Sequence, residues 1–135
     1  VELVVVIAIL GILAGIAVPK MSKSRENAAI AAHNANVRTL ESAATMYVAD
    51  NSTITPDEHQ ETKTWNGSDN QGWQDYVQEW PPIPKQLDGK KVILDDGKDT
   101  EYIIEKYSKY TVTIGTDGDI LITPGKIKVG SQVTD

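Results

Sequence analysis

Few residues of this chain have side chains and spacings that could perform chemistry. The two histidines, His33 and His59, have no neighbouring residue that would make either a catalytic base. His33 lies in an alanine-rich stretch, so we expect it at the surface or in a contact between subunits. Residues 57–61 (Asp-Glu-His-Gln-Glu) resemble a set of metal ligands, but with one histidine in a polar stretch, solvated charge is the better interpretation.

The composition excludes several other kinds of site. Without cysteines, the chain cannot form thiolate zinc sites, iron–sulfur clusters or disulfides. It has no glycine-rich phosphate loop and no nucleophile elbow. Asp117 and Asp119 could bind calcium, but their spacing is not that of an EF-hand and favours a hairpin turn. The net charge of −6 argues against nucleic-acid binding. We therefore expect no enzyme, no metal and no cofactor.

The most informative acid is Glu2, which precedes sixteen uncharged, mostly apolar residues, 3–18. A lone carboxylate in an apolar helix costs about 2.5–3.5 kcal/mol at the centre of a membrane and needs a partner. No Lys or Arg lies within the first nineteen residues, so the remaining cation is the α-amino group of another copy. Glu2 thus predicts assembly, unless it is simply an interfacial residue of an ordinary anchor.

The apolar run itself predicts a membrane helix. Sixteen residues are fewer than the roughly 20 that cross a bilayer, so we expect a retained helix whose beginning is missing from this chain. The acidic start argues against a removable signal peptide. Lys20, Lys23 and Arg25 follow the run, either as a membrane-interface flank or as a solvated helix start.

Two glycines and a proline weaken this helix. Gly11 and Gly15 form a Gly-x-x-x-Gly step, which lets helices approach closely in a membrane. Each glycine costs about 1 kcal/mol relative to alanine, and Pro19 costs about 3 kcal/mol inside a helix. Residues 11–19 are therefore predicted to be a helix-melting segment, helical in one setting and extended in another.

The remaining residues predict an α+β chain. Residues 1–19 form the hydrophobic N-terminal helix segment, and residues 20–52 continue the same long helix. The alanine-rich part of that continuation is expected to contact other subunits, while a stripe of Val37, Leu40, Ala44 and Tyr47 covers a sheet.

The C-terminal part of the chain supplies that sheet. Residues 53–89 are expected to be a loop with a short helix over 71–80. Trp65, Trp73 and Trp80 fasten this loop to the sheet, in preference to binding a glycan. Residues 90–135 predict an antiparallel β-meander of about four strands, with a tight turn at Asp117-Gly118 and a further short strand at 126–129.

The N-terminal residues resemble those of type IV pilins and the related pseudopilins of type II secretion. That family opens Phe-Thr-Leu-(Ile/Val)-Glu-Leu and continues as a hydrophobic span that ends at a proline. Val1, Glu2, Leu3 and Pro19 fall on this pattern, which implies that the chain begins three residues inside the mature subunit. The family's usual C-terminal disulfide loop cannot form here, as in pilins of Gram-positive bacteria.

The resemblance also implies a function. Glu2 would pair with the methylated N-terminal amine of a neighbouring subunit. The chain would be a single-pass protein of the inner or plasma membrane until the pilus assembly machinery extracts it. It would then be the structural subunit of an extracellular helical filament of identical subunits, for adhesion, motility or surface interaction. The alternatives are a pseudopilin or competence pilin, for protein secretion or DNA uptake, and a membrane-anchored glycan-binding module.

Overall fold

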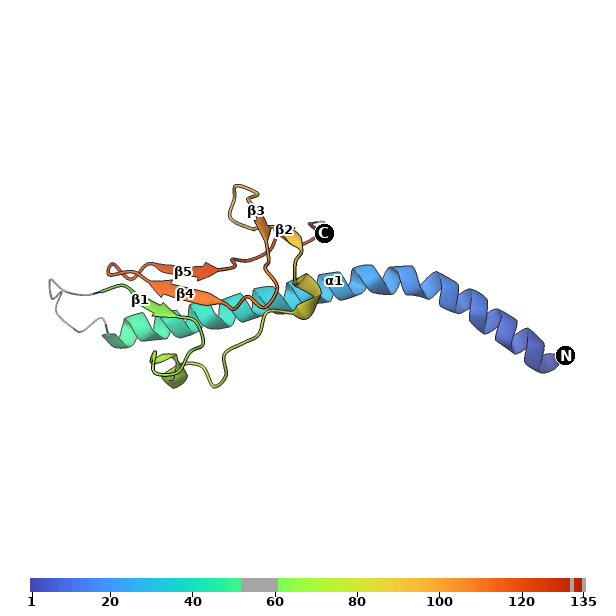
Figure 1. Ribbon diagram of the computed structural model, residues 1–135, viewed down its shortest axis with the longest axis horizontal. Helices are drawn as coiled ribbons and strands as arrows, with labels where there is room; N and C mark the ends of the chain where they lie inside the picture. Colours follow the sequence, from blue (N-terminus) through green and yellow to red (C-terminus); the bar gives the residue numbers. More distant parts are fainter. Residues whose placement is uncertain (52–60, 132, 135) are drawn as a thin grey trace.

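The chain folds as one long helix with a small β-rich domain on its C-terminal part (Figure 1). A computed structural model describes residues 1–51, 61–131 and 133–134, with the side chains of residues 17–21 left out. The helix α1 spans Glu2–Asn51 without interruption, so the two segments predicted for residues 1–19 and 20–52 are one element. At its C-terminal end, the side-chain amide of Asn51 donates to the Tyr47 carbonyl one turn back along the helix, at 2.8 Å.

Five short strands form two antiparallel sheets, which makes the chain α+β. One sheet has the order β1-β4-β5, with β1 at Lys63–Trp65, β4 at Thr111–Ile114 and β5 at Ile120–Thr123. The other pairs β2 (Lys91–Ile93) with β3 (Glu101–Ile103). The predicted simple meander is therefore wrong, because β4 pairs with β1 instead of β3. Strand β1 is three residues long and lies in the segment predicted to be a loop, too short to show an alternating pattern.

Local turn geometry accounts for two further differences from the predictions. Of the helix predicted over 71–80, only the 3₁₀ turn η1 (Trp73–Asp75) forms, directly after Gly72, whose φ of 83° is left-handed. The hairpin between β4 and β5 turns at Asp117-Gly118 as predicted, but its loop has three residues, because Gly115 N–H bonds the Asp119 carbonyl. Gly118, with φ 83°, supplies the left-handed position that such loops require.

The core lies between the C-terminal part of α1 and the sheets. Val37, Leu40 and Ala44 are almost completely buried, and Tyr47 packs edge-on against Trp65 with ring centroids 5.3 Å apart, which confirms the predicted stripe. Trp65 and Trp73 are also buried, as their predicted fastening role requires. A second 3₁₀ turn, η2 (Lys85–Leu87), places the buried Leu87 against α1. The buried hydrophobic residues of this core, among those the structure describes, are Ala29, Ile30, Val37, Leu40, Ala43, Ala44, Trp65, Trp73, Val77, Ile83, Leu87, Val92, Ile104, Tyr110, Val112, Ile114, Ile122 and Ile127.

Two consecutive polar residues of α1 are buried in this core, and they hold the segment that follows β5. His33 Nε2 lies 2.7 Å from the Gly125 carbonyl, and its Nδ1 lies 2.8 Å from the Tyr110 hydroxyl. Asn34 binds both backbone groups of Ile127, donating at 2.9 Å and accepting at 2.8 Å. The expectation that His33 lies at the surface is therefore wrong, because the residue is fully buried. Both of its ring nitrogens have hydrogen-bond partners in the core, and the alanines beside it in the sequence give no sign of them.

Burial and hydrogen bonding together set the state of the His33 ring. Burial lowers the pKa of His33 below its ordinary value of 6.5, so the ring is neutral at pH 7. The Gly125 carbonyl can only accept, so Nε2 carries the single proton and Nδ1 accepts from the Tyr110 hydroxyl. Burial likewise raises the pKa of Tyr110 to about 12, so that its hydroxyl keeps its proton.

We predict that Leu40→Ala lowers the free energy of unfolding by about 2–5 kcal/mol, because it empties a fully buried site. The measurement is the urea unfolding of a fragment that begins at residue 24, monitored by tryptophan fluorescence. This fragment retains every described core residue, since the first of them is Ala29. The exposed Ser42→Ala is the matched control and should change stability by less than about 0.5 kcal/mol. Equal losses in both variants would show that Leu40 is not packed against the sheet.

We predict that the fragment loses stability as the pH falls below 6.5. Unfolded chains bind a proton at His33 near its ordinary pKa of 6.5, whereas the folded ring resists it, so the stabilisation is complete above 6.5 and declines below. The urea midpoint should therefore fall between about pH 7.5 and 5.5, a window above most carboxylate titrations.

The His33→Gln variant should start less stable but lose the dependence on pH in this window. His59→Gln, which changes the chain's other histidine, is the control and should keep it. An unchanged slope in His33→Gln would mean that another group binds the proton.

Candidate functional site

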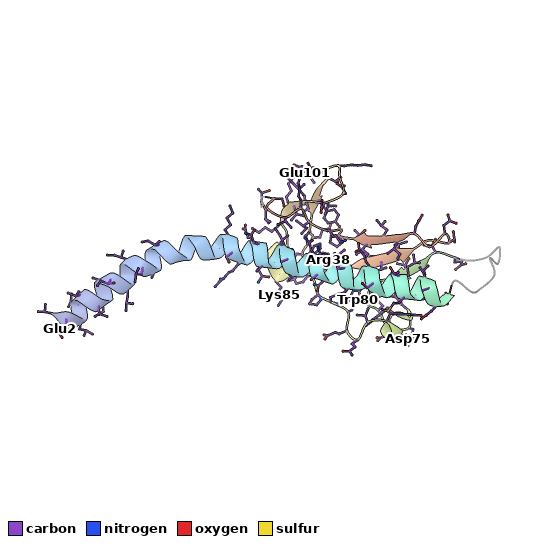
Figure 2. All side chains as sticks on the ribbon, turned by 180° about the vertical axis from the view of Figure 1, so that it is seen from behind. Glu2, Arg38, Asp75, Trp80, Lys85 and Glu101 are labelled. Carbon is purple, nitrogen blue, oxygen red and sulfur yellow. The ribbon has the colours of Figure 1, made fainter. Side chains whose placement is uncertain are left out.

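The part of α1 that precedes the domain has an uncovered apolar surface. It projects away from the sheets, and Figure 2 shows its side chains pointing into open space on all sides. Each of its large apolar side chains is 52–104% exposed: Val1, Leu3, Val4, Val5, Val6, Ile7, Ile9, Leu10, Ile12, Leu13 and Ile16. A helix that is apolar around its whole circumference is stable only when its surroundings are apolar on every side.

Glu2 lies at the tip of this projecting helix (Figure 2). It occupies the first turn, where a carboxylate interacts favourably with the positive end of the helix dipole. Its side chain is exposed, and none of the ion pairs among the described residues involves it. Among the described residues Glu2 is therefore a solvated charge beside an apolar surface, with no Lys or Arg side chain paired to it.

The predicted helix-melting segment is helical in the single subunit. α1 runs through Gly11, Gly15 and Pro19, so any melting would belong to another state of the chain. A Cβ atom at either glycine would have no neighbour within 4 Å, so nothing within the described subunit requires glycine there. Figure 1 shows that α1 is straight beside the domain and curves along the projecting part, which contains these helix-weakening residues.

Between the apolar surface and the core, α1 presents small residues. Ala28, Ala31, Ala32 and Ala35 are exposed, and Ala29 turns into the core. Lys23 and Arg25, which precede them, are exposed as well. This alanine surface would allow another helix to approach closely, as predicted for the contact between subunits.

The other candidate sites gain no support as centres of chemistry. The described residues contain no group of three or more metal-ligating side chains, and Asp117 and Asp119 are exposed in the β4–β5 turn. His59 and the acids at 57 and 58 lie outside the described residues. His33 has a structural role that sequence reasoning missed, and the only signal for it was a polar pair, His33-Asn34, that interrupts an alanine-rich stretch.

In the part of the chain that the structure describes, no helix has the length and apolarity needed to cross a membrane. Comparison with protein families, with functionally characterised proteins and with solved structures finds no match to this chain.

Proposed function

We propose that this chain is the structural subunit of a type IV pilus. It polymerises through its N-terminal helix into an extracellular filament for adhesion, motility or surface interaction. The observation that carries the proposal is the uncovered apolar surface at the N-terminal end of α1, whose large side chains are all more than half exposed. The order of elements, a long helix whose C-terminal part packs on an antiparallel sheet, agrees with a pilin fold.

Two environments would cover such a surface, and a pilin uses both. Before assembly, lipid would surround the projecting helix of a single subunit in the inner or plasma membrane. After extraction by the assembly machinery, helices of identical subunits would replace the lipid. Neighbouring helices would then approach closely at two places. One is the open space beside Gly11 and Gly15, and the other is the exposed alanine surface.

Glu2 supports the filament over a permanent membrane anchor. An anchor gains nothing from a carboxylate at the start of its apolar surface, and an unpaired charge inside a bundle of helices is costly. No Lys or Arg lies in residues 1–16, and no ion pair among the described residues involves Glu2. The α-amino group of a neighbouring subunit would neutralise Glu2 and at the same time set the axial position of each subunit.

We predict that Glu2→Ala and Glu2→Gln abolish filaments without disturbing the fold. The substituted position lies outside the core, which begins at Ala29, so the thermal unfolding temperature of the domain should not change. Subunits should accumulate in the membrane fraction while sheared surface filaments become scarce or absent. The measurement compares the two fractions in cells that express only the variant, with Ser42→Ala as the matched control. Normal filament yield from Glu2→Ala would overturn the role of the acid.

We predict that replacing Gly11, Gly15 and Pro19 together by alanine gives a more stable helix and a poorer filament. The three substitutions restore about 5 kcal/mol of helix preference to a segment that the single subunit already holds as helix. If the segment melts on assembly, filaments should become stiffer or fewer, as judged by electron microscopy. A filament map of the unmodified chain with an unbroken helix through residues 1–50 would refute melting and leave the subunit assignment intact.

A further inference from the structure

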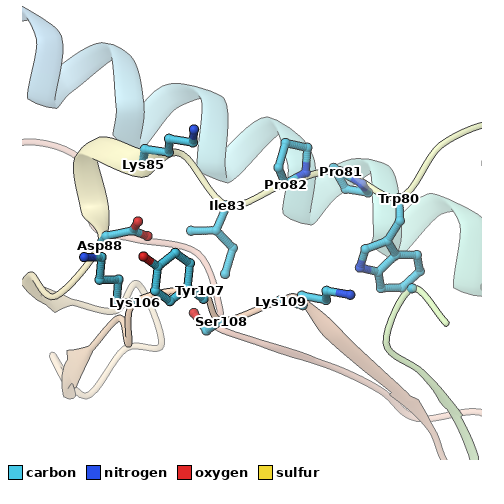
Figure 3. A pocket seen from close by; sticks show the side chains of 11 residues that line it. Trp80, Pro81, Pro82, Ile83, Lys85, Asp88, Lys106, Tyr107, Ser108 and Lys109 are labelled. Carbon is cyan, nitrogen blue, oxygen red and sulfur yellow. The ribbon is translucent and has the colours of Figure 1, made fainter.

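A pocket on the β-rich domain lies apart from the apolar surface of α1. It has a volume of about 630 Å³ and opens between two loops (Figure 3). One wall is the chain from Trp80 to Ile83, and the other is the segment from Lys106 to Lys109. A cavity of this volume is in the range that holds a small ligand or a few units of a polymer.

The lining of the pocket is basic, although the chain as a whole is acidic. Lys85, Lys106 and Lys109 line it together with a single carboxylate, Asp88, whereas the whole chain has a net charge of −6. All three lysines are exposed, and none takes part in the ion pairs found among the described residues. The pocket is therefore a local positive site that favours an anionic ligand.

Two aromatic rings complete the lining. Tyr107 is 83% exposed and has a φ of 65°, a left-handed conformation that is unfavourable for a non-glycine residue and is found most often at functional sites. Trp80 is half-buried and rests edge-on against Trp73, with ring centroids 5.2 Å apart. It lies directly over Gly67, where a Cβ atom would come within 2.5 Å of the indole ring. Trp80 is therefore held in place without a ligand, whereas Tyr107 presents its ring to solvent.

Each aromatic ring has a lysine beside it. The Lys106 ammonium lies 5.2 Å from the centroid of the Tyr107 ring. Lys109 lies on the same wall as Lys106 and extends across toward Trp80 on the other wall (Figure 3). Ile83 lies between the two rings. The pocket thus presents two aromatic rings, one with an ammonium 5.2 Å from its centroid and the other with a lysine extending toward it, separated by an aliphatic side chain.

We propose that this pocket binds an acidic polysaccharide, one whose sugar units each present a ring face and a carboxylate. A sugar ring places its apolar C–H face on an aromatic ring, and its carboxylate pairs with the adjacent lysine. Two neighbouring units of the polymer would occupy the Tyr107–Lys106 and Trp80–Lys109 pairs. Because the pocket is open at the surface, the polymer can continue beyond it in both directions.

Single-stranded nucleic acid is the less suitable anion. Proteins that bind it follow the phosphate backbone with an extended basic groove, and they favour arginine for phosphate. This pocket has three lysines and no arginine, and its basic residues are gathered in one place, so it does not form such a groove.

The test is calorimetric titration of the full chain in non-ionic detergent with a galacturonic acid trimer. We expect saturable binding that the neutral maltotriose does not show. Tyr107→Gly should weaken binding about tenfold or more, because it removes a ring while glycine accepts the left-handed backbone. Lys106→Gln and Lys109→Gln should also weaken it. The matched control is Lys98→Gln, an exposed lysine outside the pocket lining, which should leave affinity unchanged.

Several results would overturn the proposal. These are the absence of saturable binding at millimolar trimer, equal binding of maltotriose, equal weakening by Lys98→Gln, and tighter binding of a deoxyadenylate oligonucleotide. Thermal unfolding of each variant separates loss of binding from loss of fold. The result is independent of filament formation, because Glu2→Ala leaves the pocket intact and should bind the trimer with unchanged affinity.

Discussion

The arrangement of the whole molecule depends on the hydrogen bonds of His33 and Asn34. These two residues of α1 hold the backbone at Gly125 and Ile127 on one side. On its other side the same segment pairs with β2 and the residues after it, through Lys128 N–H to the Ile93 carbonyl and Asp95 N–H to the Lys126 carbonyl. The segment after β5 therefore joins the helix, the three-stranded sheet and the two-stranded sheet. If α1 shifted along its axis, several buried polar groups would lose their partners, at about 1–3 kcal/mol each.

This fixed position determines how much of α1 projects. The core begins at Ala29, one turn before the bound pair, and the described side chains before it are exposed except for Glu26, which is half-buried. Apolar packing alone would not set that boundary, because hydrophobic contact is not directional and an alanine-rich helix could slide on a sheet. The hydrogen bonds of His33 and Asn34 are directional, so they fix the position of α1 along its axis relative to the sheets. They separate the part of the helix that stabilises the domain from the part left for lipid or for other subunits.

The features that could be predicted from the sequence are those that repeat along the chain. The length of α1, its buried stripe at Leu40 and Ala44, and the hairpin at Asp117-Gly118 all follow from periodicity or from a turn pair with one dominant conformation. The pairing of β1 with β4 could not be predicted, because residues far apart in the chain meet there and three residues are too few to show alternation. The burial of His33 was missed for a related reason. Its partners, Tyr110 and Gly125, lie more than seventy positions away.

The proposed site was only partly accessible from sequence. Glu2 stands out because a charge beside an apolar run is improbable in any fold. The pocket was invisible, because its two walls are loops brought together by tertiary structure, and the three lysines are dispersed among other charged residues. The tryptophans are the conspicuous residues of this region in the sequence, but Trp65 and Trp73 belong to the core, and of the three only Trp80 lines the pocket.

Asn36 connects the long helix to the pocket. This residue of α1 donates from its side-chain amide to the Pro82 carbonyl at 3.1 Å, and the turn η2 packs on the same helix through Leu87. One wall of the pocket is therefore attached to the element that would form the core of a filament, so every subunit would hold its pocket in the same orientation to the filament axis. A polysaccharide repeats along its length as a filament does. Successive pockets could then engage one polymer chain, and weak binding at each would combine into strong attachment through high effective concentration. A single open pocket with two ring-and-lysine pairs suits that use better than tight capture of one small molecule.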